Sequence, residues 1–351
     1  MRRPLLIALL MAGVGLGATV LWVRDYLATP LSIPEQGYRL AIEPGTSWSA
    51  VARHLADDDI TPWAAVLRAC GQLTGQAGRI KAGEYDLVPG ATPASLLDQL
   101  VAGKVVLHKL TLVEGWSVSE IVSALRAEPA LKATLESTLK GPVNATRAGE
   151  LATSLASELD LPWPSAEGAF LPETYLFASG TTDREVLATA HAALRDKLNV
   201  AWAARRPDLP LASPYEVLVL ASIVERETAL ASERPQIAGV FIRRLHKGMR
   251  LQTDPTVIYG LGPRFDGNLT RTDLETDSPW NTYTRAGLPP TPIALASGAA
   301  IDAATRPADS KALFFVASGK GDGSHRFTAT LQDHEAAVRA YLVELRRRDS
   351  N

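Results

Sequence analysis

The sequence is poor in cysteine and carries no excess of charge of either sign. Cys70 is the only cysteine among 351 residues, which excludes an internal disulfide and a metal site built from cysteines. The 36 lysines and arginines nearly balance 38 aspartates and glutamates, for a formal net charge of −2. Proteins that bind nucleic acid usually carry a clear positive excess, so we expect no nucleic-acid partner.

Histidine is also scarce, and its placement does not indicate a metal site. Six histidines are present. His325 and His334 are near each other in the sequence, but no second ligand pattern accompanies them. We therefore predict structural or surface roles for both, and neither a metal nor another cofactor.

An uncharged apolar run at residues 5–23 follows two arginines near the start of the chain. Its length is enough to cross a bilayer as a helix. The positive charges before it predict that residues 1–4 stay in the cytoplasm and that the rest lies outside the inner membrane. A cleaved signal peptide is the alternative, because residues 15–17 form a small-x-small pattern.

After a predicted linker at residues 24–37, the chain shows a mixture of strand and helix signals. Its length, with 46% hydrophobic and 21% charged residues, predicts two or three packed domains. Segments 42–47, 88–93 and 113–117 each combine an extended stretch, a glycine turn and a serine or threonine before an amphipathic helix. Segment 81–87 alternates like a strand. We predict an α+β protein, and the uneven spacing excludes a solenoid.

The stretch 213–228 contains the clearest helix signal. It opens with a serine–proline pair and a glutamate in the spacing of a capping box. Residues 217–224 are almost all apolar, which predicts a buried helix. Glu225 ends this run, where burial would raise the pKa of its carboxyl group and suit it to donate a proton near neutral pH. The alternative is that Glu225 emerges from the core and pairs with Arg226 or Arg243.

Polar residues in three later segments are candidates for a binding site. Glu167, Thr174 and Tyr175 supply hydrogen-bonding groups beside an aromatic face, which suits the hydroxyl rim and apolar face of a sugar. The alternative is a purely structural loop, in which Tyr175 belongs to the core and Glu167 acts as a cap. Asp254 lies in a polar turn, where capping alone would also explain it. Segment 278–293 is rich in proline, glycine and small polar residues, and such ordered loops usually serve a site.

Five segments together resemble the endolytic murein transglycosylases, the YceG-like family of membrane-anchored enzymes that cut the glycan strands of peptidoglycan. They follow the family's order and comprise residues 81–87, 167–175, 221–228, 249–260 and 278–293. The resemblance implies a lytic transglycosylase in which Glu225, the glutamate after Ser-Ile-Val, is the catalytic residue. It also implies that the glycan is bound by residues of the other segments: Glu167, Thr174, Tyr175, Gln252, Asp254, Asn281 and Tyr283.

The sequence departs from the family pattern at two places. Trp280 stands where the family has tyrosine, which exchanges one aromatic residue for another. Residues 294–298 retain only the glycine of the family's Asn-Pro-Gly, and this difference affects the expected local backbone.

The resemblance further implies an order of domains. After the membrane helix and the linker, residues 38–106 are expected to form a small α/β LysM-like module, a type that binds glycans containing N-acetylglucosamine. Residues 107–348 are expected to form the mixed α+β catalytic domain, with a helical insertion near residues 126–160. The family's location predicts a periplasmic catalytic domain that acts on growing strands and limits their elongation. The expected partners are peptidoglycan glycan strands and the inner membrane, with peptidoglycan synthases as further candidates.

The reaction implied is a non-hydrolytic cleavage of the β-1,4 bond between N-acetylmuramic acid and N-acetylglucosamine. Glu225 would protonate the glycosidic oxygen and then take a proton from the C6 hydroxyl group, which closes a 1,6-anhydro ring. One carboxylate is enough, unlike the usual pair of a glycoside hydrolase, because the C6 hydroxyl group is already positioned within the substrate. Glu227 lies about 200° around the helix from Glu225, so we expect it not to share the site.

Two alternatives stay open. An ordinary muramidase would hydrolyse the same bond and would need a second carboxylate, such as Asp254 or Glu167. A catalytically inactive, membrane-tethered scaffold would bind peptidoglycan without cleaving it, and the altered segment 294–298 is the observation that favours it.

Overall fold

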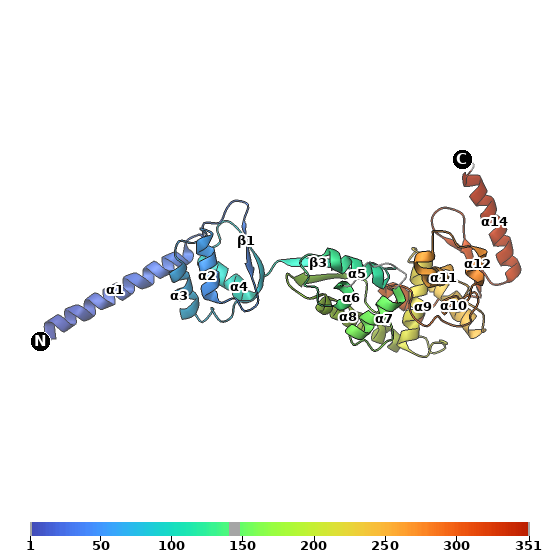
Figure 1. Cartoon of the computed structure of the whole chain (residues 1–351), viewed down its shortest axis with the longest axis horizontal. Helices are drawn as coiled ribbons and strands as arrows, with labels where there is room; N and C mark the ends of the chain where they lie inside the picture. Colours follow the sequence, from blue (N-terminus) through green and yellow to red (C-terminus); the bar gives the residue numbers. More distant parts are fainter. Residues whose placement is uncertain (1, 140–147, 350–351) are drawn as a thin grey trace. The chain divides into compact units, whose positions relative to one another are not determined.

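A computed structural model describes residues 2–139 and 148–349 of the chain (Figure 1). The chain forms two compact units. The first consists of residues 1–108 and 176–180, and the second of residues 109–175 and 181–351.

The first unit begins with the long helix α1 (Arg2–Ala28), so the predicted linker is helical at its start. Among the described residues, we find no helix whose length and hydropathy meet the requirements of a membrane span. The membrane helix expected at residues 5–23 is therefore not confirmed.

The rest of the first unit is a small α/β module around an antiparallel strand pair. Its sheet pairs Leu40 with Tyr85 at the centre of the register, and both side chains are fully buried. Ser47 caps the first helix after the sheet by accepting a hydrogen bond from the backbone of Ala50. Two strand–turn–helix units predicted from the sequence are confirmed, whereas the middle helix was not predicted. The elements are β1 (Tyr38–Ile42), α2 (Trp48–Asp57), α3 (Ala64–Leu73), β2 (Gly83–Leu87) and α4 (Pro93–Ala102).

The segment that follows contains a second strand pair and three short helices. Strands β3 (Leu107–Thr111) and β4 (Thr174–Ala178) form a two-stranded sheet. The turn at residues 113–117 leads into α5 (Val118–Ala127), as predicted, and a capping box formed by Ser117 and Glu120 begins this helix. The predicted helical insertion contains α6 (Glu136–Leu139) and α7 (Ala148–Glu158), and its residues 140–147 lie outside the described residues.

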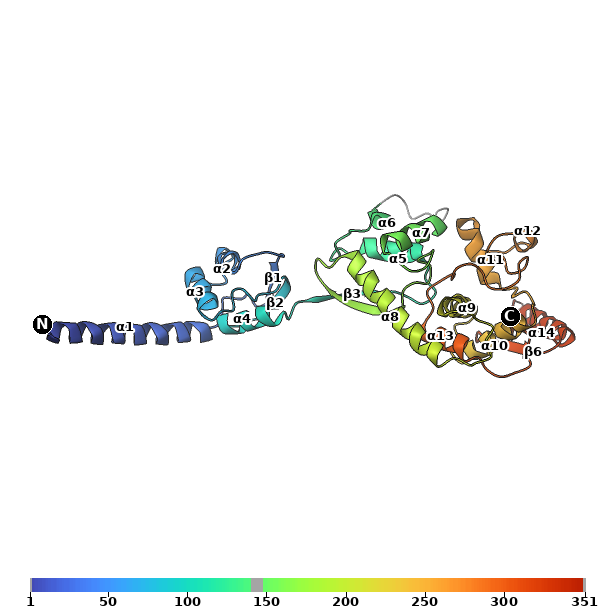
Figure 2. The ribbon, with the colours of Figure 1, turned by 90° about the horizontal axis from the view of Figure 1, so that it is seen from below.

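The core of the second unit is organised around α9 (Pro214–Glu227), as the apolar run predicted. Every residue from Val217 to Val224 is buried. Figure 2 shows α9 among the helices that it contacts. Ser213 accepts the hydrogen bond from the Glu216 backbone, but the Glu216 carboxylate accepts from Ala212 instead of completing the predicted capping box. The contacting helices are α8 (Asp183–Ala203), α10 (Arg234–His246), α11 (Asp254–Leu261) and α13 (Gly298–Thr305).

A third strand pair ends the second unit. Strands β5 (Phe314–Ala317) and β6 (His325–Thr328) form an antiparallel hairpin, and α14 (Leu331–Asp349) contacts both. The short helices η2 (Gly262–Arg264) and α12 (Arg271–Glu275) follow α11. Small sheets and many helices in the described residues confirm the α+β class.

Candidate active site

A cavity of about 400 Å³ opens at the C-terminal end of α9. Three residues predicted to bind substrate, Gln252, Asp254 and Tyr283, line it together with Glu227. Phe314 and Phe315 of β5 and Leu331 and His334 of α14 also line it. Residues from segments far apart in the sequence therefore meet at one cavity.

Hydrogen bonds between two polar segments shape this cavity. The backbone of Gln252 donates to the carbonyl oxygen of Thr282 at 3.1 Å, and the backbone of Thr253 donates to the Thr282 hydroxyl group at 3.1 Å. Gln252 takes a left-handed φ of 52°, which sets the direction of the chain before Asp254. The Tyr283 hydroxyl group donates to Asp254 Oδ1 at 2.6 Å. Burial and the Asp254 charge both raise the pKa of Tyr283, so its proton is retained.

Glu227 is the last residue of α9. It keeps some surface accessible through the cavity, while the surrounding protein removes most of its hydration. This burial raises the pKa of Glu227 to about 7, with a smaller contribution from the Asp254 charge. The Thr253 hydroxyl group donates a hydrogen bond to Glu227 and opposes the shift. A carboxyl group with such a pKa carries its proton in a large fraction of molecules at neutral pH.

Glu227 was expected to lie outside the site, but it lines the cavity, and one signal in the sequence pointed to it. A glutamate at the last position of a helix lies at the negative end of the helix dipole, where a carboxylate is unfavourable. A glutamate in this unfavourable position at the end of an apolar helix therefore indicates a functional role.

Glu225 has different surroundings. Its side chain is 5% exposed and forms an ion pair with Arg234 at 2.7 Å. The other carboxylate oxygen accepts hydrogen bonds from the backbone nitrogen and hydroxyl group of Ser297. The apolar surroundings expected for Glu225 are thus replaced by three donors, and its partner is neither Arg226 nor Arg243. The described residues that line the cavity include Glu227 but not Glu225.

Ser297 lies in the segment that departs from the family pattern. It caps α13, and Ala294, Leu295 and Ala296 before it are buried. The Leu295 backbone donates to Trp116 and accepts from Gly115. The altered segment is therefore an ordered part of the core that also holds Glu225.

Glu167 is fully buried away from the cavity. It accepts hydrogen bonds from the backbone of Val118, at the start of α5, and from the Tyr259 hydroxyl group, both at 3.1 Å. Burial raises the pKa of Glu167 to about 7. This geometry matches the capping alternative considered for Glu167.

The three other predicted substrate residues also make contacts within the protein. Thr174 is exposed and hydrogen-bonds through its hydroxyl group to that of Thr111. The half-buried Tyr175 donates to the carbonyl oxygen of Leu171 at 2.7 Å. Buried Asn281 donates to three backbone carbonyl groups and accepts from the backbone of Tyr283. Asn281 thus determines the shape of the loop that presents Tyr283.

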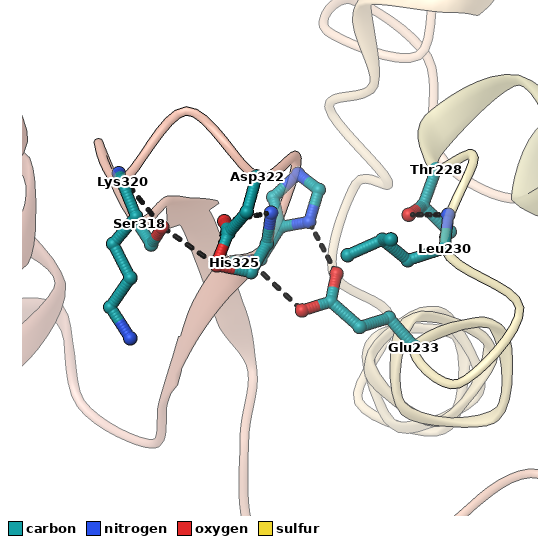
Figure 3. Close-up of polar contacts among 8 residues, drawn as sticks. Thr228, Leu230, Glu233, Ser318, Lys320, Asp322 and His325 are labelled. Carbon is teal, nitrogen blue, oxygen red and sulfur yellow. Dashed lines mark hydrogen bonds and ion pairs between the residues drawn. The ribbon is translucent and has the colours of Figure 1, made fainter.

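The segment after Glu227 is tied to the β5–β6 hairpin (Figure 3). His325 hydrogen-bonds to both carboxylate oxygens of Glu233. The His325 backbone nitrogen donates to one oxygen at 2.9 Å, and His325 Nδ1 contacts the other at 2.7 Å. The His325 ring packs edge-on against Phe315, with centroids 5.5 Å apart. His325 therefore has a structural position, whereas His334 lines the cavity and is not a simple surface residue. In the described parts of the chain, no group of three or more His, Cys, Asp or Glu residues is arranged to hold a metal ion.

Comparison with known proteins assigns these features to a family. The model of the YceG-like family matches residues 40–340. An endolytic murein transglycosylase from Bacillus subtilis is 29% identical over 335 residues, which cover 93% of this chain and 91% of that protein. An endolytic murein transglycosylase from Streptococcus pneumoniae is 28% identical over 285 residues, covering 75% of this chain and 51% of that protein.

A solved structure agrees with this assignment. The crystal structure of a yceG-like protein from Listeria monocytogenes is 28% identical in sequence, with a TM-score of 0.50. The match covers 86% of this chain and 99% of that one.

Proposed function

Given that the chain belongs to the YceG-like family, we propose that it is an endolytic murein transglycosylase. It cleaves peptidoglycan strands internally, at the β-1,4 bond between N-acetylmuramic acid and N-acetylglucosamine, and leaves 1,6-anhydro ends. The names of its relatives support this reaction. The observation that carries the proposal is a cavity lined by a glutamate whose pKa is raised to about 7.

We assign the proton transfers to Glu227 in preference to Glu225. Glu227 lines the cavity and retains a proton near neutral pH, whereas both oxygens of Glu225 are used by Arg234 and Ser297. In the first step Glu227 donates its proton to the glycosidic oxygen as the bond to C1 of the muramic sugar breaks. Its carboxylate then accepts the proton of the C6 hydroxyl group as the C6 oxygen bonds to C1. The leaving sugar keeps the first proton, and Glu227 ends protonated.

Asp254 supports this chemistry from the same cavity. Positive charge develops on the sugar ring in the transition state, and a preorganised carboxylate stabilises such charge. The hydrogen bond from Tyr283 holds Asp254 in place.

The muramidase alternative rests on this same residue. Asp254 lines the cavity with Glu227 and would activate a water molecule in a hydrolytic reaction. Glu167, the other carboxylate considered for this role, is buried outside the cavity with both oxygens hydrogen-bonded. The scaffold alternative depended on segment 294–298, which is ordered in the core.

We also propose a membrane anchor and a glycan-binding module. The apolar run at residues 5–23 and the arginines before it support a single inner-membrane span, with residues 1–4 cytoplasmic and the catalytic unit periplasmic. The α/β module that includes β1, α2, α3 and β2 supports a LysM-like assignment for residues 38–106. Protease treatment of intact spheroplasts should degrade the second unit. Protection of the whole chain would exclude this topology.

Product analysis tests the reaction. Mass spectrometry of purified glycan strands treated with the wild-type protein should show internal fragments ending in 1,6-anhydro-N-acetylmuramic acid. Reducing ends in their place would identify a hydrolase. Intact strands that still bind the protein would support the scaffold.

A further inference from the structure

One wall of the cavity combines apolar rings with a histidine that the proposed reaction does not use. His334, near the start of α14, stacks almost parallel on Phe314, with ring centroids 5.1 Å apart and planes inclined by 20°. Phe315 and the exposed Leu331 line the cavity beside them. The wall thus offers apolar surface next to an imidazole.

The surroundings of His334 specify which ring nitrogen can serve a ligand. Nδ1 is buried and has no hydrogen-bond partner among the described residues. Burial and the nearby Arg244 charge lower the pKa of His334, so the ring is neutral at neutral pH. A buried N–H group without an acceptor is costly, which favours the tautomer with its proton on Nε2. Since the Nδ1 edge is buried, the edge that reaches the cavity carries Nε2–H.

Among the described residues of this wall, few hydrogen-bond donors are left for an anionic ligand. Arg244 is 7% exposed, and it donates from Nε to Leu313 and from Nη1 to Leu251, both at 2.7 Å. Its guanidinium group is thus largely committed to backbone carbonyl groups. Asp254 adds a negative charge to the lining of the same cavity. A neutral group with a carbonyl oxygen and an apolar end fits these surroundings better than a carboxylate.

We propose that this wall is a subsite for the acetamido group of an N-acetylated sugar. The Nε2–H group of His334 donates to the acetyl carbonyl oxygen, and the acetyl methyl group packs against Phe314, Phe315 and Leu331. An acetamido group is neutral and combines these two features within a few ångströms. The subsite rests on the proposed function, since it selects among glycan strands by their N-acetylation.

Binding measurements without turnover test the subsite. In full-length protein carrying Glu227→Gln, dissociation constants are compared for N-acetylated strands and for the same strands after chemical N-deacetylation. His334→Phe preserves the stacking but removes the donor. It should weaken binding to acetylated strands about tenfold, as for one lost hydrogen bond, and leave binding to deacetylated strands unchanged. His334→Gln, which restores a terminal N–H donor, should recover most of the loss.

The controls separate the subsite from general damage and from failure of the reaction. His246→Phe replaces an exposed histidine at the end of α10 and should bind both strands like its parent. Equal weakening of both strands by His334→Phe, or no weakening, would overturn the subsite. If the wild-type protein cleaves no strand but His334 still governs discrimination, the proposed reaction fails and the subsite stands. If cleavage occurs and discrimination does not depend on His334, only the subsite fails.

Discussion

Two sides of the C-terminal end of α9 hold glutamates two residues apart in very different surroundings. On one side, Glu225 is bound by Arg234 and by Ser297 at the start of α13. On the other, Glu227 borders the cavity with Asp254 and has its pKa raised to about 7. The first arrangement supplies every donor that a carboxylate needs and leaves none of its oxygens for a substrate. The second leaves a proton that can be donated. The side of α9 on which each glutamate lies therefore separates the structural position of Glu225 from the position of Glu227, which is open to chemistry.

Glu227→Gln should produce the largest effect on activity. Loss of a general acid lowers kcat/KM by about 10²- to 10⁴-fold, measured on purified glycan strands. The free energy of unfolding should not fall, because the amide oxygen can still accept the hydrogen bond from Thr253. Activity within tenfold of wild type would remove Glu227 from the proton transfers.

Glu225→Gln is the matched variant on the other side of the helix. It leaves Arg234 largely buried without its counter-ion, so the free energy of unfolding should fall by about 3 kcal/mol, as for other broken buried pairs. Chemical denaturation measures this change, and activity per folded molecule should fall less than in Glu227→Gln. A stable but inactive Glu225→Gln protein would restore Glu225 as the catalytic residue and reverse the comparison.

Glu167→Gln tests whether a raised pKa is enough to make a group catalytic. The pKa of Glu167 is about 7 in the folded protein, above its ordinary value of 4.5. The protonated form of Glu167 therefore contributes to the free energy of unfolding, on the order of 3 kcal/mol. This contribution is complete below about pH 4.5 and is lost as the pH rises through about 7. Glutamine does not titrate, so the variant should not lose stability in this way. The difference in the free energy of unfolding between wild type and Glu167→Gln should therefore shrink between pH 5 and pH 8.

Urea unfolding of wild type and Glu167→Gln at pH 5 and at pH 8 measures this difference in the free energy of unfolding. Because this residue lies outside the cavity, activity per folded molecule should stay near the wild-type level. A loss of activity like that of Glu227→Gln would place Glu167 in the reaction.

Asp254→Asn removes the carboxylate proposed to stabilise the transition state, so it should lower kcat/KM, by less than Glu227→Gln does, and it also acts on Glu227 through charge. The Asp254 charge raises the pKa of Glu227, so its removal lowers that pKa. Because the proposed reaction needs the protonated form of Glu227, activity in the variant should disappear at lower pH than in wild type. Tyr283→Phe removes the hydrogen bond to Asp254 but keeps the Asp254 charge. In this variant the basic limb of the pH dependence of kcat/KM should therefore move less than in Asp254→Asn. A basic limb that does not move in Asp254→Asn would show that the two carboxyl groups are not coupled.

Several sites on this protein illustrate the limits of sequence patterns. Gln252, Asp254 and Tyr283 were selected from matched segments, and they do meet at the cavity. Glu167 and Asn281 were selected for the same reason, but one is fully buried at the start of α5 and the other holds a loop together. A matched segment contains both the groups that face a ligand and the groups that support them, and the segment alone does not distinguish the two.

The sequence by itself determined the α9 helix, its burial, the strand–turn–helix units and the family, because capping residues, glycine turns and hydrophobic periodicity act over a few neighbouring positions. The tertiary structure alone decided which glutamate borders the cavity, that Arg234 and Ser297 bind Glu225, and that His334 lines the cavity. Each residue turns a helix by about 100°, so the neighbours of a side chain at its end depend on elements far away in the sequence. Ser297, for example, is 72 residues from Glu225, and only the packing of α13 against α9 brings them together.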